Sequence, residues 1–198
     1  MSRNREFDPE EALGKAMQLF WQKGYDDTSM DDVVEATGVS RYGIYSEFGS
    51  KRELFLAAMD HYQERIAGSS FGIVEQPDAS LGEILRYFSH LAEALSGSRD
   101  RLGCLMCNAA TEVAPRDEDV RKKVEFAMNR LSAGFRSALC NAMEKGEIAP
   151  DLDTAMVCDF LTGTVLGASV MARSGAVGSM IENAIAMALR SILPKTSL

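Results

Sequence analysis

Proline is scarce in this 198-residue chain, which has only 5, and no stretch of strand length alternates β-branched and polar residues. Apolar residues instead recur at three- and four-residue steps, which is the period of an amphipathic helix. Glycines at 24, 38 and 68 stand where helices are expected to end. The sequence therefore predicts an all-α fold with helices over 9–23, 30–37, 41–47, 51–67, 80–96, 101–113, 117–145, 152–173 and 178–193.

Two further absences concern the compartment. The N-terminus lacks the apolar core of a secretory signal, and the longest weakly polar run, 161–172, is shorter than the roughly 20 residues that cross a bilayer. The 4 cysteines are too sparse for a disulfide framework and are typical of reduced thiols. These features predict a cytoplasmic protein without a membrane partner.

The chemistry of an enzyme is also missing. His61 and His90 are the only histidines, and they lie in separate helices with no Gly-rich phosphate loop or Ser-His-Asp order around them. Cys104 and Cys107 form a C-x-x-C pair, but the second such pair of a zinc site is lacking. We expect no enzyme, no cofactor and no metal. A helical enzyme or adaptor remains the alternative to a DNA-binding function.

Positive charge is in deficit over the whole chain, whose formal net charge is −8. For a nucleic-acid partner the local distribution matters more than the total. Over residues 39–52, Arg41, Lys51 and Arg52 stand against Glu47, so this short segment has a net charge of +2. A phosphate backbone could lie along it.

The same segment has the pattern of a helix-turn-helix. The helix that ends at Thr37 is followed by Gly38, which tolerates positive φ, by the apolar Val39, and by Ser40, a good N-cap. The next helix turns Ile44 to one side and a polar group of side chains to the other. That group comprises Arg41, Tyr42, Tyr45 and Ser46. Guanidinium, phenol and serine groups suit phosphates and base edges, so these residues form the candidate DNA surface.

The segment from Ala12 to Leu54 resembles the DNA-binding domain of the tetracycline-repressor (TetR) family of transcriptional regulators. The residues that carry the resemblance are Phe20, Gly24, Thr28, Val34, Ala36, Gly38-Val39-Ser40, Tyr45, Phe48 and Ser50-Lys51. The resemblance implies a homodimer on an inverted-repeat DNA operator and repression that a small-molecule inducer releases. It also implies DNA contacts from Thr28, Arg41, Tyr42, Tyr45 and Lys51. Ser40, Gly43 and Ser46 are added as neighbouring candidates.

The remaining sequence would form the ligand-binding and dimerisation part. We expect a DNA-binding domain over 1–54 and a helical domain over 55–198, with 51–67 as the connecting helix. Candidate pocket residues are Phe88, Met106, Met128, Phe135 and Phe160, with Asn108, Thr111 or Glu112 as polar anchors. Plain core packing is the alternative for these residues.

The last two helices carry features of close helix contact. The small residues are Gly163, Gly167, Ala168 and Ala172, and the apolar seam is Ile181, Ala184, Ile185, Ala188 and Ile192. The TetR resemblance assigns such elements to a four-helix dimer interface. An intramolecular core is the alternative.

Cys104 and Cys107 support two hypotheses. On a regular helix they would face the same way, and the helix start with Arg101 nearby would favour a thiolate and hence a thiol- or electrophile-sensing repressor. A direct disulfide would strain the helix, so a switch would involve modification of one thiol, or pairing with Cys140 or Cys158 from a neighbouring helix. The other hypothesis, which we favour from sequence, is that both thiols are buried and inert.

Overall fold

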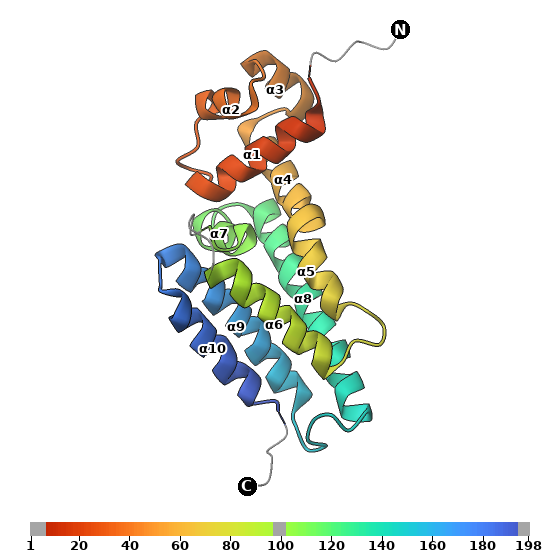
Figure 1. Cartoon of the computed structure of the whole chain (residues 1–198). Coiled ribbons are helices and arrows are strands. Elements are labelled where there is room, and N and C mark those ends of the chain that lie inside the picture. The colour runs from red at the N-terminus through yellow and green to blue at the C-terminus, as the bar shows by residue number, and fades with distance from the viewer. Residues whose placement is uncertain (1–6, 97–101, 194–198) are drawn as a thin grey trace.

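The computed structural model describes residues 7–96 and 102–193, and it confirms the all-α fold (Figure 1). The helices are α1 (Pro9–Lys23), α2 (Met30–Thr37), α3 (Arg41–Phe48), α4 (Lys51–Tyr62), η1 (Gln63–Ala67), α5 (Gly68–Val74), α6 (Leu81–Ser96), α7 (Leu105–Glu112), α8 (Glu118–Glu144), α9 (Thr154–Ser174) and α10 (Gly178–Arg190). Because α4, η1 and α5 are continuous, the described ranges hold nine helical units.

Helices α1 to α3 and the first turns of α4 form a compact head at one end of the molecule (Figure 1). Local signals start its helices: the Asp8 side chain accepts from the Glu10 N–H before α1, and Ser29 with Asp32 closes a capping box before α2. Phe20 of α1 packs edge-on against Phe55 of α4 at 5.1 Å between ring centres. This aromatic contact fixes the head on α4.

The connecting helix is longer than the sequence indicated. Gly68 has φ −59°, so it continues the helix instead of ending it, and the chain passes through the π-helical turn η1 into α5. Buried Phe71 and Val74 pack α5 between α6 and α8. The burial of these apolar side chains outweighs the weak helix propensity of one glycine.

The body is a bundle around α8. Its buried side chains Leu131, Phe135 and Leu139 follow the helical period and face α5, α6 and α9. Phe135 stacks on Phe88 at 5.6 Å between ring centres, and Tyr87 meets Phe135 edge-on at 5.2 Å. An aromatic cluster therefore forms the centre of the body.

Helix α7 begins four residues later than predicted. Gly103 has φ +63°, and a Cβ there would lie 2.7 Å from the Ser169 carbonyl oxygen, so this position breaks the helix and requires glycine. Cys104 is consequently an extended N-cap residue (φ −115°, ψ 129°) and not part of the helix. Arg101, which entered the thiol hypothesis, lies outside the described residues.

Helix α9 is long and apolar enough to cross a membrane by length and composition. One such helix is weak support for a membrane span, since core helices of soluble bundles pass the same test. Here Leu161, Val165 and Ala168 are buried, and α9 packs against α8 and α10. The apolar residues of α9 therefore pack into the bundle on at least one face of the helix.

Candidate functional site

The helix-turn-helix has the geometry that the sequence predicted. Gly38 takes a left-handed conformation (φ 72°, ψ 9°), Val39 is buried beneath the turn, and the Ser40 hydroxyl accepts from the Gly43 N–H at 3.1 Å. Ile44 is buried and holds α3 against the head. The outer side of α3 is thereby left for a partner.

The outer side of α3 presents Arg41, Tyr42, Tyr45 and Ser46, all exposed. Tyr42 is 77% exposed and Tyr45 41% exposed, which is unusual for large aromatic side chains. Arg41 pairs with Asp31 of α2 at 2.6 Å, and both side chains reach solvent. An exposed ion pair of this kind contributes little stability, so Arg41 can exchange its partner for a phosphate at small cost.

A second positive feature adjoins α3. The N–H groups at the start of α4 and the ammonium of Lys51 give this helix end the character of an anion site. The Lys51 ammonium lies 4.4 Å from the centre of the Tyr25 ring, which holds the side chain in place. The Ser50 backbone N–H and hydroxyl lower the pKa of the Glu53 carboxyl in the same capping box.

Two of the predicted DNA contacts have structural roles instead. Thr28 is fully buried, and its hydroxyl donates to the Gly24 carbonyl at 2.6 Å, so its side chain cannot reach DNA. Gly43 lies where a Cβ would be 2.8 Å from the Val39 side chain and 3.3 Å from Phe7. The residue is needed for close packing of α3, and it has no side chain to offer a base.

The position of Thr28 leads to a stability prediction. Thr28→Val keeps the shape but leaves the Gly24 carbonyl without its buried donor, so the free energy of unfolding should fall by about 1–3 kcal/mol. Chemical denaturation measures this change. Thr111→Val is the matched control, because the Thr111 hydroxyl makes a similar bond to a helix carbonyl on an exposed surface. Equal losses in both variants would contradict the assigned role.

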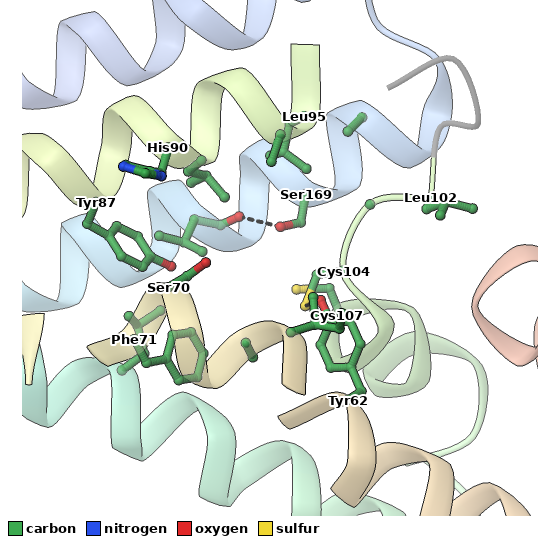
Figure 2. Close-up of a pocket in the computed structure, with 18 of the residues that line it drawn as sticks. Tyr62, Ser70, Phe71, Tyr87, His90, Leu95, Leu102, Cys104, Cys107 and Ser169 are labelled. Atoms are coloured by element: carbon green, nitrogen blue, oxygen red, sulfur yellow. Dashed lines mark hydrogen bonds between the residues drawn. The ribbon is translucent and has the colours of Figure 1, made fainter. Parts of the chain in front are cut away.

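A cavity of about 170 Å³ lies in the body next to the head (Figure 2). Its walls come from α1, α4, η1, α5, α6, α8, α9 and the segment before and within α7. The lining residues are Trp21, Tyr62, Ile66, Ala67, Ser70, Phe71, Tyr87, His90, Leu91, Ala94, Leu95, Leu102, Gly103, Cys104, Cys107, Met128, Leu131, Val165, Ser169 and Ala172. Most are apolar, and the part of the lining that the structure describes includes no Asp, Glu, Lys or Arg.

The cavity contains only part of the predicted pocket. Met128 lines it, whereas Phe88, Phe135 and Met106 are buried core residues outside its lining. The Asn108 amide donates to the Leu102 carbonyl at 3.0 Å. Two other positions point elsewhere: Thr111 is exposed on α7, and Phe160 is 50% exposed on the outer face of α9. The pocket assignment is therefore corrected for all of these except Met128.

Cys104 and Cys107 both line the cavity, side by side with Tyr62 (Figure 2). Cys107 is buried, but Cys104 is partly exposed, so the expectation that both are buried is wrong for Cys104. The hydrogen bond from Cys107, and after it the bond from the Tyr62 hydroxyl, lowers the pKa of the Cys104 thiol. Burial and the neighbouring Cys104 raise the pKa of Tyr62.

The other two cysteines lie elsewhere. Cys140 is exposed on α8, and Cys158 is buried on α9 with its thiol donating to the Ser132 carbonyl at 3.1 Å. Neither belongs to the cavity lining. Across residues 7–96 and 102–193, no group of three or more His, Cys, Asp or Glu side chains is placed to hold a metal.

Two residues that the sequence pattern did not indicate, Trp21 and Arg173, connect the cavity and the body to the head. Trp21 belongs to α1 of the head yet lines the cavity, and its ring lies 5.0 Å from that of Tyr62. Arg173 of α9 donates to the Trp21 and Gln22 carbonyls at 3.2 and 3.0 Å. The sequence feature that could have indicated this contact is Arg173, a cation near the end of an apolar helix, because such a side chain can bind the free carbonyls at the C-terminus of another helix.

The C-terminal end of α7 also contacts the head. The Asp26 N–H in the loop after α1 donates to Glu112 at 2.8 Å, and Arg116 pairs with the Asp26 carboxylate. Glu112 is thus part of the head–body contact and not a pocket anchor. Nearby, Arg52 of α4 binds Asp117 at 2.6 Å and holds the pKa of that carboxyl at about 2.

The outer face of α9 and α10 is apolar and uncovered in the single chain. On α9 it comprises Met156, Phe160, Gly163, Gly167 and Val170, at alternating four- and three-residue steps. On α10 and its flanks it continues with Val177, Met180, Met187 and Leu193. We call this surface the outer apolar face.

The predicted interface residues divide between two faces. Gly163 and Gly167 lie on the outer apolar face. Ala184 is half-buried, and the other six are buried within the chain, where α10 packs on α6 and α9: Ala168, Ala172, Ile181, Ile185, Ala188 and Ile192. For these six the intramolecular alternative holds, because an amphipathic seam faces the nearest apolar layer, which is the protein's own body.

Comparison with known proteins gives the same result for both parts of the chain. The family "Bacterial regulatory proteins, tetR family" matches residues 12–58, and "Tetracyclin repressor-like, C-terminal domain" matches residues 82–188. The HTH-type transcriptional repressor ComR of Escherichia coli is 34% identical over 88% of this chain and 83% of the relative. The uncharacterized HTH-type transcriptional regulator YezE of Bacillus subtilis is 30% identical over 87% and 90%.

A solved structure agrees. A cysteine mutant of the TetR family transcriptional regulator CifR, complexed with a 26bp double-strand operator DNA, superposes with a TM-score of 0.84. It is 25% identical, and the match covers 96% of this chain and 100% of that one. With the exposed α3, the head joined to a helical body and both family matches in place, the chain belongs to the TetR family of DNA-binding transcriptional regulators, a non-enzymatic class.

Proposed function

We propose that the protein is a repressor that binds an inverted-repeat operator as a homodimer and is released when a small molecule occupies the cavity. The observation that carries the proposal is the position of the cavity, whose wall includes Trp21 of the head. An occupant can bias the head only through different affinities for its DNA-competent and DNA-incompetent positions. A cavity at the head–body contact provides such a difference.

DNA recognition is assigned to α3 and the start of α4. Tyr42, Tyr45, Arg41 and Ser46 would enter a major groove, and Lys51 would bind a phosphate. Two heads in a two-fold dimer read half-sites about 34–36 Å apart or a multiple of that spacing. The operator should therefore be an inverted repeat.

Dimerisation is assigned to the outer apolar face. A monomeric soluble protein rarely leaves so continuous an apolar stripe exposed. Gly163 and Gly167 leave space for close approach, since no atom lies within 4 Å of an added Cβ at either position. A second copy of this chain, related by a two-fold axis, would cover the stripe with the same stripe.

The proposal also keeps the predicted division of the chain. Residues 1–54 would act as the DNA-binding unit and 55–198 as the ligand-binding and dimerisation unit, joined by the continuous helix that starts with α4. A regulator of this kind acts on chromosomal DNA, so we place it in the cytoplasm.

Selection of bound fragments from genomic DNA tests the proposal. Wild-type protein should enrich a small set of fragments that share an inverted repeat, and Tyr42→Ala should lower affinity for that repeat by about 1–3 kcal/mol while affinity for unrelated DNA changes less. If wild-type protein enriches no fragment at low salt, the proposed function fails.

Lys51→Ala should behave differently from Tyr42→Ala. A lost phosphate contact weakens binding to all sequences, and it lowers the slope of log affinity against log salt by about 1. Affinity measured at several salt concentrations checks this. Lys122→Ala removes an exposed lysine of the body and should leave the slope unchanged; an equal change there would contradict the assignment.

A further inference from the structure

The cavity selects for a small, neutral and largely apolar molecule. Among its described lining residues the polar side chains are hydroxyls, thiols, His90 and the Trp21 indole, and no carboxylate, ammonium or guanidinium is present to pair with a charge. Its volume of about 170 Å³ is sufficient for one six-membered ring. His90 and Ala94 line it and are also exposed, so the cavity opens to solvent along α6.

One wall of the cavity carries a nucleophile in an activating environment. Cys104 is partly exposed, its Sγ accepts a hydrogen bond from the Tyr62 hydroxyl at 3.4 Å, and Cys107 lines the same part of the cavity. It stands at the N-cap of α7, where the helix dipole favours negative charge. Hydrogen bonds donated to sulfur stabilise the thiolate, which is the reactive form.

A buried donor without a partner lies in the same wall. The Nε1–H of Trp21 is buried and has no hydrogen-bond acceptor among the described residues. A buried donor left unpaired costs about 1–3 kcal/mol. A ligand with a carbonyl oxygen could accept a hydrogen bond from this N–H. The lining therefore combines an unpaired hydrogen-bond donor with a nucleophilic sulfur.

We propose that the cavity binds small α,β-unsaturated carbonyl compounds and that Cys104 adds covalently to them. Tyr62 positions the sulfur through its hydrogen bond and stabilises the thiolate. The hypothesis favoured from the sequence, that both thiols are buried and inert, does not account for a partly exposed Cys104 beside an open apolar cavity. The two proposals are linked, because this inference rests on the proposed release of DNA by a cavity occupant.

The addition balances without an oxidant or reductant. The Cys104 thiol loses its proton to water, and the thiolate electron pair forms a C–S bond to the β-carbon of the enone. The π pair of the carbon–carbon double bond moves to give an enolate, with its charge on the carbonyl oxygen. The α-carbon then takes a proton from water, so one thiol and one enone give one thioether.

The adduct would act on the head through two contacts. The thiols stand at the start of α7, and the end of the same short helix holds the head through Glu112 and the Asp26 N–H. Trp21 contacts Tyr62, which is the hydrogen-bond partner of Cys104. A bulky group on Cys104 therefore meets the head side of the cavity first.

Treatment with 2-cyclohexen-1-one tests the proposal, and cyclohexanone of nearly the same shape is the unreactive control. All proteins carry Cys140→Ala to remove the exposed thiol of α8, except one reference protein that keeps Cys140 and carries Cys104→Ser. Intact-mass and peptide mass spectrometry should show one enone on Cys104, formed about tenfold faster than on a Cys140 protein that carries Cys104→Ser, since an ordinary thiol is only a few per cent thiolate at pH 7.

Operator binding is measured before and after treatment, each protein being compared with itself. After dialysis has removed free compound, enone-treated protein that has Cys104 should remain released from the operator. Cys104→Ser protein treated with the enone, and either protein treated with cyclohexanone, should bind the operator again. Tyr62→Phe should slow the addition, because it removes a donor to the sulfur. Absence of an adduct on Cys104, or an adduct that leaves operator affinity unchanged, would overturn the inference. Adduct formation needs no DNA, so it is scored even if the proposed operator function fails.

Discussion

Gly167→Glu is expected to convert the dimer into monomers and to abolish specific operator binding. Gly167 lies on the outer apolar face of α9 and has free space around an added Cβ, so the single chain can fold with Glu there. In an isologous interface the change places two carboxylates among apolar groups. An uncompensated buried charge costs several kcal/mol, roughly 3–5 by analogy with broken buried pairs.

The loss of DNA binding follows from the loss of the second head. A single head makes half of the contacts, and affinity should fall by about 10³ or more, towards the level of non-specific binding. Sedimentation or light scattering measures the oligomeric state, and a binding titration measures the operator affinity. Ala133→Glu places the same charge at an exposed position of α8, outside the proposed interface, and should remain dimeric. A dimeric Gly167→Glu protein would refute the assigned interface.

Phe135→Ala should give the largest loss of stability among single substitutions considered for the body. Phe135 is fully buried between Phe88 and Tyr87, and truncation removes both aromatic contacts and leaves a cavity in a closely packed centre. The free energy of unfolding should fall by about 3–5 kcal/mol. Urea denaturation of the dimer, analysed at fixed protein concentration, gives the difference.

The same helix offers a control of the same residue type. Phe126 of α8 is 63% exposed, so Phe126→Ala should change stability by less than about 0.5 kcal/mol. Similar losses for the two substitutions would show that Phe135 does not form the body's centre. A specific loss of ligand response in a fully stable Phe135→Ala protein would restore its earlier assignment to the pocket.

The fold could be predicted from the sequence because its signals are local. Capping residues such as Ser29 and Ser50, the glycine at the turn and the helical period of α8 each act within a few residues. The predicted helix end at Gly68 and the predicted start of α7 were wrong for a different reason. Burial of Phe71 carries a helix past one glycine, whereas the close approach of Gly103 to Ser169 stops another, and both are tertiary effects.

The candidate sites were predictable to different degrees. The outer side of α3 follows from the period of one short helix. The cavity does not, because a period separates inward from outward positions but cannot tell a filled interior from an unfilled one. Phe160 shows a related difficulty: α9 is apolar on two faces, so the sequence alone could not separate the face toward the body from the face toward a partner.

The π-helical turn η1 sets an angular phase between the two ends of the connecting helix. In a regular helix each residue advances by about 100°, so Ala67 would stand about 140° around the axis from Tyr62. With i→i+5 bonding the chain accommodates one surplus residue, and Tyr62, Ala67 and Phe71 all line the same cavity. The residue count between head and cavity is therefore a fixed quantity. Insertion or deletion of one residue in this helix would rotate the cavity wall away from the head, while the helix on either side of the change stayed intact.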